Sequence, residues 1–260
     1  MTRALILAAG QGTRLRPLTD HKPKCLVPLM GKSLLERQTV TLRSAGVDDI
    51  HVATGYCAGQ IEDLGYETSL NPRFADTNMV ETLFCAQAFI RKQGDLIIAY
   101  GDIVYQANNL QALLACDDEI ALMIDSNWRD LWSIRLENPL DDAETLKIDS
   151  HGYVVELGKK PDSYEQIEGQ YTGLIKIRAG KLDQLIDFYK GLDRSAVYDG
   201  KDFDNMYMTS FLQLLINDGW KAKAVEVNNG WLEVDSVEDL EQYEKMSREG
   251  SLGTFYKAEC

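Results

Sequence analysis

Short apolar runs alternate with amphipathic stretches through the first half of this chain. Runs of roughly four to eight apolar residues are typical of buried strands. We expect buried strands over residues 3–8 and 96–100, and further strands over residues 50–54, 66–70 and 120–125. Helices are expected between them, because Ser33 and Asn78 each begin a capping pattern with a glutamate three positions later. Strands that alternate with helices are typical of a doubly wound, mostly parallel sheet, so we predict an α/β fold.

The pattern changes after residue 125, where turns separate the strand-like runs. We expect these later strands over residues 133–136, 147–148, 153–157 and 172–177. Such a series is typical of an antiparallel meander, and we predict a small antiparallel insertion over about residues 126–180. Helices and short strands follow, and Ser236 caps the last helix. We therefore expect a single domain over residues 1–260, with a mobile tail over 250–260 that lacks periodicity.

Composition and charge exclude several classes of function. No apolar run approaches the roughly 18 residues of a membrane span, and the N-terminus shows no signal-peptide cleavage site. A cytoplasmic protein without a membrane span is therefore expected. The five cysteines contain no C-x-x-C pair, which favours reduced thiols over a disulfide framework or a zinc site. The net charge of −14 argues against nucleic acid as a partner.

The basic residues are concentrated near the N-terminus. Residues 1–43 hold eight Lys and Arg against two acidic residues, a net charge of +6, which leaves −20 for the rest of the chain. A small basic region on an acidic protein suits a small anionic ligand. The alternative is that these side chains belong to a solvated face.

The segment after the first expected strand is Leu7-Ala-Ala-Gly-Gln-Gly-Thr-Arg-Leu-Arg-Pro17. Ligands of open α/β sheets bind at the carboxyl ends of strands, and small residues there let backbone N–H groups approach phosphate oxygens. Arg14 can hold phosphate oxygens in a bidentate manner, and Lys24 is a second cation within reach. Because Leu15 stands where G-x-G-x-x-G needs glycine, the dinucleotide fingerprint is absent, as is the G-K-[ST] of a P-loop. The alternative is a glycine-rich turn with solvated basic residues.

This string, together with Pro23-Lys24, resembles the signature of the nucleotidyltransferases that make activated sugars and activated choline phosphate. The resemblance implies a Rossmann-like nucleotidyltransferase fold, a nucleoside triphosphate bound by the loop, and catalytic roles for Arg14 and Lys24. The expected reaction is attack by a phosphate or phosphonate oxygen on the α-phosphorus, with release of pyrophosphate. That oxygen is ionised at neutral pH, so no general base is needed. The predicted nucleotide-binding residues are Leu7, Ala8, Ala9, Gly10, Gly12, Thr13, Asn78, Thr82 and Gly101.

Three carboxylates are candidates for a Mg²⁺ site. Asp102 follows a buried strand at the sheet edge that holds the loop, and strand alternation places Glu233 and Asp235 on one face. Two carboxylates on one face repel each other unless a cation lies between them. The alternatives are that Asp102 forms a turn, and that Glu233 and Asp235 belong to a solvent-facing acidic strand. The resemblance to the choline-phosphate branch of this family implies that Asp102, Glu233 and Asp235 bind Mg²⁺.

The segment over residues 71–78 indicates which nucleobase the site binds. Asn78 can both donate and accept hydrogen bonds to a base, and it can also serve as a plain helix N-cap. The segment resembles the matching loop of phosphocholine cytidylyltransferases, which favours CTP. It lacks the P-x-G-[LT]-A loop that is usual in sugar-nucleotide enzymes.

Aromatic and acidic residues are mixed in the segments expected to hold the acceptor. Such a pocket suits a cationic amine through cation–π contact and charge pairing, so choline phosphate, aminoethylphosphonate and an amino-acid-derived phosphate all qualify. The alternative is that the aromatic residues pack the insertion's own core. The predicted acceptor-binding residues are Asp125, Trp128, Trp132, Tyr171, Asp204 and Tyr207.

Two rival functions stay open from the sequence. One is a sugar-1-phosphate nucleotidyltransferase that uses UTP, dTTP or GTP. The other is a non-catalytic nucleotide-binding module, which predicts loss of the metal carboxylates, although all three positions hold acids here. The sequence is also compatible with a homodimer.

Overall fold

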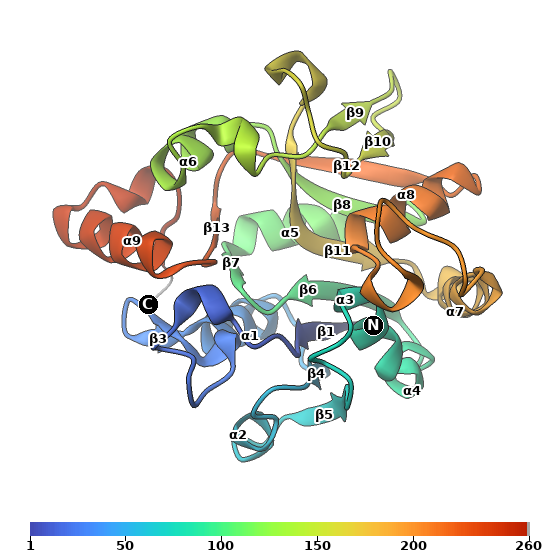
Figure 1. Ribbon diagram of the computed structural model, residues 1–260, viewed down its shortest axis with the longest axis horizontal. Helices are drawn as coiled ribbons and strands as arrows, with labels where there is room; N and C mark the ends of the chain where they lie inside the picture. Colours follow the sequence, from blue (N-terminus) through green and yellow to red (C-terminus); the bar gives the residue numbers. More distant parts are fainter. Residues whose placement is uncertain (259–260) are drawn as a thin grey trace.

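Within residues 1–258, the part of the chain that the computed structural model describes, seven strands form one sheet in the order β12-β8-β11-β6-β1-β4-β5 (Figure 1). Its strands are β1 (Thr2–Ala8), β4 (Ile50–Thr54), β5 (Glu67–Leu70), β6 (Asp95–Tyr100), β8 (Ile120–Asp125), β11 (Gln170–Ile177) and β12 (Ala222–Val227). Neighbouring strands are parallel except at β11, which runs antiparallel to β6 and β8. The predicted mostly parallel α/β sheet is confirmed.

Hydrophobic cores lie on both faces of this sheet. Along β1, Ala4 and Ile6 belong to one buried cluster while Leu5 and Leu7 belong to the other, because successive strand residues point to opposite faces. One cluster includes residues of α1, α2, α5, α6 and α9, and the other includes residues of α3, α4, α7 and α8. The helices are α1 (Leu34–Ser44), α2 (Gly59–Glu62), α3 (Met79–Cys85), α4 (Gln87–Ile90), α5 (Ala107–Ala115), α6 (Trp128–Arg135), α7 (Leu182–Gly191), α8 (Met208–Asn217) and α9 (Val237–Glu249).

Six short strands of the described residues pair outside the main sheet. They are β2 (Pro28–Leu29) with β3 (Lys32–Ser33), β7 (Ile103–Tyr105) with β13 (Trp231–Glu233), and β9 (Leu146–Ile148) with β10 (Val154–Leu157). Between residues 126 and 180 the antiparallel pair outside the sheet is β9–β10, because the strand expected over 172–177 is part of β11 in the main sheet. The antiparallel part of the insertion is thus smaller than the sequence predicts.

The prediction of a strand over residues 133–136 is wrong, because this segment forms the end of the helix α6. Trp128, Leu131 and Trp132 are buried on one face of α6, and this spacing of three and four residues is the helical period. The alternation of polar and apolar residues over residues 133–136 is typical of a strand, and it accounts for the wrong prediction.

The C-terminal segment packs against the fold as far as it is described. Leu252 and Tyr256 are buried, and Gly230 N–H donates to Phe255 O. These contacts join the segment to the fold up to Tyr256, and the mobile tail over residues 250–260 stays a prediction, of which residues 259–260 lie outside the described residues. Among the helices of the described chain, none is both long and apolar enough to cross a membrane.

Candidate active site

A left-handed glycine shapes the loop after β1. Gly12 has a φ of 62°, a backbone conformation that favours glycine, and the 3-10 helix Thr13–Leu15 follows it directly. The hydroxyl of Thr19 donates to Gly12 O at 2.7 Å. A Cβ at position 12 would lie 2.9 Å from Lys24 Cβ. The absence of a side chain therefore lets Lys24 pack closely against the loop.

Glycine also permits a close approach between β6 and β1. Gly101 N–H donates to Leu7 O at 2.9 Å, and a Cβ on Gly101 would lie 2.7 Å from that same oxygen. Asp102, the next residue, is thereby held beside the carboxyl end of β1. This is the edge at which ligands bind in open α/β sheets.

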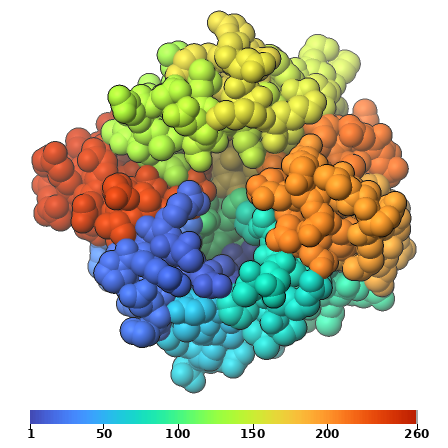
Figure 2. Space-filling model, in the orientation of Figure 1, coloured from blue at the N-terminus to red at the C-terminus, as the bar shows by residue number. Residues whose placement is uncertain are grey.

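A first cavity of about 270 Å³ opens at this edge. Figure 2 shows the hollow, which is bordered by the N-terminal loop (blue), α3 and the segment before it (teal), and the start of α8 (orange). All nine residues predicted to bind the nucleotide line this cavity, as do both predicted catalytic residues, Arg14 and Lys24. Sequence reasoning missed four further lining residues, which are Cys25, Phe74, Thr77 and Met79.

The pairing of β7 with β13 brings the predicted metal ligands together. Glu233 pairs with Ile103, and Val234 N–H donates to Asp102 O at 3.0 Å. One carboxylate oxygen from each of Asp102, Glu233 and Asp235 lies within 4.8 Å of the others. Residues from the middle of the chain and from its C-terminal part thus build one acidic cluster, in which Asp102 and Asp235 line the first cavity.

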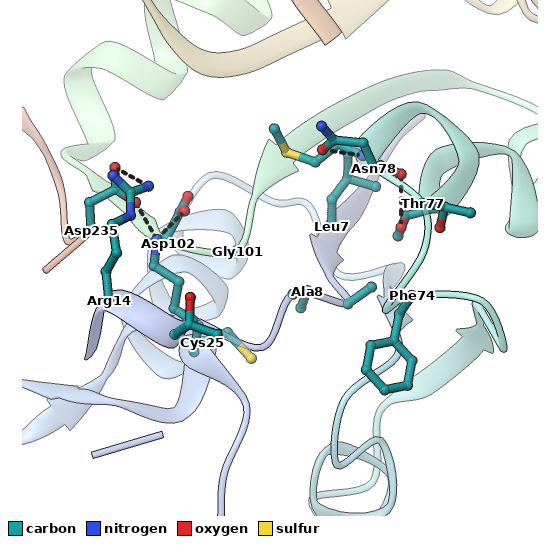
Figure 3. A pocket seen from close by; sticks show the side chains of 17 residues that line it. Leu7, Ala8, Arg14, Cys25, Phe74, Thr77, Asn78, Gly101, Asp102 and Asp235 are labelled. Atoms are coloured by element: carbon teal, nitrogen blue, oxygen red, sulfur yellow. Dashed lines mark hydrogen bonds and ion pairs between the residues drawn. The ribbon is translucent and has the colours of Figure 1, made fainter. Parts of the chain in front are cut away.

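Cations from the N-terminal loop contact this cluster. Lys24 Nζ donates to Asp102 Oδ2 at 2.6 Å and to Asp235 Oδ1 at 2.5 Å, and Arg14 Nη2 lies 2.9 Å from Asp235 Oδ2 (Figure 3). Burial disfavours the charged form of Lys24, but the Asp102 and Asp235 carboxylates raise its pKa above the usual value. Burial also disfavours ionised Asp235, yet the ion pairs with Lys24 and Arg14 lower its pKa.

The carboxylate oxygens of the cluster fit a hard divalent cation. Asp102 Oδ1 is buried and has no hydrogen-bond partner in the described chain, so a lone pair remains for a ligand. Burial and the neighbouring Asp235 raise the pKa of Glu233 to about 8. Such crowded carboxylates are relieved when a cation lies among them.

Arg135 is a functional candidate that the sequence analysis did not identify. This buried side chain at the end of α6 lies 2.9 Å from Glu233 Oε2 and 3.1 Å from Asp239 Oδ1. Asp239 in turn belongs to the capping box of α9 with Ser236. Arg135 therefore connects α6 to β13 and to the start of α9, and it fixes the position of Glu233. Arg135 follows the buried Leu131 by four residues, so it lies on the same face of the helix. This helical spacing could have identified Arg135 from the sequence.

A second cavity of about 170 Å³ adjoins the first, and both are lined by Met79 and Asp235. Three of the predicted acceptor-binding residues line it, which are Trp132, Tyr171 and Tyr207. The lining also includes the carboxylates of Asp142, Glu144 and Glu233, and among its described residues there is no Lys, Arg or His. The carboxylate cluster therefore lies where the two cavities meet.

The other three predicted acceptor-binding residues lie outside this cavity, which corrects the prediction. Asp125 is fully buried, because its carboxylate accepts hydrogen bonds from Asn127 N, Asn229 N and the indole of Trp231. Trp128 is buried against Trp132 and Tyr164. Asp204 forms an ion pair with Arg73 on the surface. Asp125 and Trp128 are therefore parts of the protein interior, whereas Asp204 lies at the surface.

Asn78 has the N-cap role that was its alternative assignment. Its Oδ1 accepts from Met79 N at 2.8 Å, and the side chain also lines the first cavity. Thr82, one turn along α3, accepts from Asn71 Nδ2 at 2.9 Å. The hydrogen bonds of both residues hold the wall of the cavity in place.

This fold, with a signature loop facing a carboxylate cluster, is that of a nucleotidyltransferase. A family model described as a MobA-like NTP transferase domain matches residues 4–152, and the chain belongs to that family. The chain is 46% identical over 252 residues to the CTP:phosphoglutamine cytidylyltransferase of Campylobacter jejuni subsp. jejuni serotype O:2. This alignment covers 93% of this chain and 99% of that protein. The predicted family is thereby confirmed.

Solved structures share the fold. The phosphocholine cytidylyltransferase of Streptococcus pneumoniae superposes with a TM-score of 0.71 at 21% identity, covering 95% of this chain and 99% of that one. The inositol-1-phosphate CTP transferase of T. maritima superposes with a TM-score of 0.73 at 22% identity, covering 95% and 96%. At these identities the likeness concerns the architecture alone.

Proposed function

We propose that this enzyme transfers CMP from CTP to the phosphate or phosphonate group of a small amine-bearing acceptor, releasing pyrophosphate, with Mg²⁺ as cofactor. The observation that carries the proposal is the junction of two cavities at one carboxylate cluster. A nucleotide and an acceptor in adjoining cavities would meet at that junction. The name of the Campylobacter jejuni relative supports CTP as the nucleotide.

The residues at the junction suit transfer by positioning and charge neutralisation. An acceptor phosphate is already ionised, so the site needs oriented cations rather than a general base. Lys24 and Arg14 lie beside the cluster and can neutralise charge on the α-phosphate of the transferred nucleotidyl group and on pyrophosphate. Asp102, Glu233 and Asp235 would hold Mg²⁺, which, when bound, offsets the negative charge of the triphosphate.

The second cavity favours a cationic acceptor. Glu144 lines this cavity. Its carboxylate accepts a long hydrogen bond of 3.5 Å from Thr209 Oγ1. Burial, together with the nearby Asp142, raises the pKa of Glu144 to about 7. The rings of Trp132 and Tyr207 line the same cavity. An ammonium group there would gain both charge pairing and cation–π contact.

A panel of nucleotides and acceptors tests the proposed reaction. We expect pyrophosphate release to be fastest with CTP and a phosphate that bears an amine, and to require Mg²⁺. Turnover of a sugar 1-phosphate with UTP, dTTP or GTP, without turnover of any amine-bearing acceptor, would support the sugar-nucleotide alternative. Nucleotide binding without pyrophosphate release from any pair would support a non-catalytic module.

Glu144→Gln is expected to weaken the preference for a cationic acceptor by about 30-fold, because a partly buried ion pair loses its negative partner. The measurement compares kcat/KM for choline phosphate with that for 3,3-dimethylbutyl phosphate, its neutral analogue. The matched control is Glu156→Gln, since Glu156 forms an ion pair with Lys159 away from the second cavity. An unchanged preference in the Glu144 variant would contradict this role.

A further inference from the structure

The two ends of the first cavity differ in chemical character. Arg14, Asp102 and Asp235 gather at one end, whereas Phe74 and Asn78 lie at the other (Figure 3). The charged end suits a triphosphate and its cation. The uncharged end is therefore left for the nucleobase of the proposed nucleotide.

The polar side chains at the uncharged end are largely engaged with the protein. Thr77 Oγ1 donates to Arg73 O at 2.9 Å and accepts from Asn71 Nδ2 at 2.9 Å. The buried Asn71 also accepts from Arg73 N at 2.9 Å through Oδ1. These bonds fix the loop on both sides of Phe74, and they leave its ring as the large apolar surface that the loop presents to the cavity.

The position of Phe74 depends on a glycine in the neighbouring loop. A Cβ at Gly55 would lie 2.5 Å from Phe74 Cβ, so the bare glycine backbone lets Phe74 pack directly against it. The ring of Tyr56 is 6.2 Å from the Phe74 ring, between centroids. The Phe74 ring is only partly buried. A fixed and partly exposed aromatic ring in a cavity for a nucleotide is a surface on which a base can stack.

We propose that Phe74 is the stacking residue for the nucleobase, and that it contributes affinity without selecting the base. This inference rests on the proposed function, since it takes the first cavity to bind a nucleoside triphosphate. Stacking on an aromatic ring tolerates any base, because every base presents a π face. The choice of base then falls to the backbone and to side chains such as Asn78, and Phe74 acts on all nucleotides alike.

Titration calorimetry of Phe74→Ala with CTP, UTP and inorganic tripolyphosphate, each with Mg²⁺, tests the inference. We expect the affinities for CTP and UTP to fall by the same factor, roughly 5- to 150-fold, while that for tripolyphosphate is unchanged. Phe74→Tyr is expected to keep the wild-type affinities. Phe74→Leu, which keeps an apolar side chain without a ring, is expected to lose affinity for both nucleotides.

Two results would overturn the stacking role. One is an equal loss of affinity for CTP and tripolyphosphate, because the ring would then support the loop and not the base. The other is an unchanged CTP affinity in both the Ala and Leu variants. Failure of the wild-type protein to bind any nucleotide is a distinct outcome, which would overturn the proposed function and this inference together.

Discussion

Asp102→Asn is expected to lower kcat/KM on the order of 10³-fold and to abolish binding of the divalent cation. Asparagine keeps the shape of the side chain but removes the negative charge that faces Glu233 and Asp235. It also leaves Lys24 without one of its two carboxylate partners. Turnover is measured as pyrophosphate release, and cation binding is measured separately with Mn²⁺ by electron paramagnetic resonance.

Asp117→Asn is the matched control for this variant. Asp117 also forms an ion pair, with Arg178, but it is exposed and lines neither of the two cavities. The control should keep wild-type turnover and Mn²⁺ binding. An Asp102 variant that still binds Mn²⁺ with wild-type affinity would refute the assignment of Asp102 as a ligand, whatever its turnover.

The lining of the first cavity could be predicted from sequence because the chemistry is local. Residues 7–13 form the end of the buried strand β1 and the loop after it, so their small side chains lie at the carboxyl edge of the sheet. Gly101 and Asp102 follow the adjacent parallel strand and reach the same edge. Strand order was not needed to group these residues.

The carboxylate cluster required a step that periodicity alone cannot supply. Alternation along a strand places Glu233 and Asp235 on one face, but the β7–β13 pairing that brings them to Asp102 joins segments about half the chain apart. The resemblance to known nucleotidyltransferases provided that link. Without it, an acidic strand beside an acidic helix was an equally sound interpretation.

The errors concern side chains whose roles depend on tertiary partners. Asp125 is at the end of β8, where the sequence favours a ligand site, yet the indole of Trp231 and the backbone of Asn229 occupy its carboxylate. Arg135 escaped notice because its segment was assigned to a strand. In both cases the deciding partner comes from the C-terminal third of the chain, which no local pattern can identify.

Lys24→Met is the prediction that separates catalysis from cation binding. Methionine fills similar space without charge, so the ammonium group that contacts Asp102 and Asp235 is lost. We expect kcat to fall about 10²- to 10³-fold, since removal of one charged donor from a preorganised site has an effect of that size. KM for CTP should change much less, because the loop backbone that contributes to the first cavity is unaltered.

The affinity for the divalent cation should be retained or increased in the Lys24 variant, in contrast to Asp102→Asn. In the structure the Lys24 ammonium lies against the same carboxylates that a cation would use, so the two positive charges repel each other and compete for these oxygens. Mn²⁺ titration of the variant measures this directly, with Lys190→Met, an exposed position on α7, as the control. Weaker Mn²⁺ binding together with the loss of kcat would mean that Lys24 mainly organises the carboxylate cluster. Retained Mn²⁺ binding with a low kcat would assign Lys24 to the α-phosphate of the transferred nucleotidyl group.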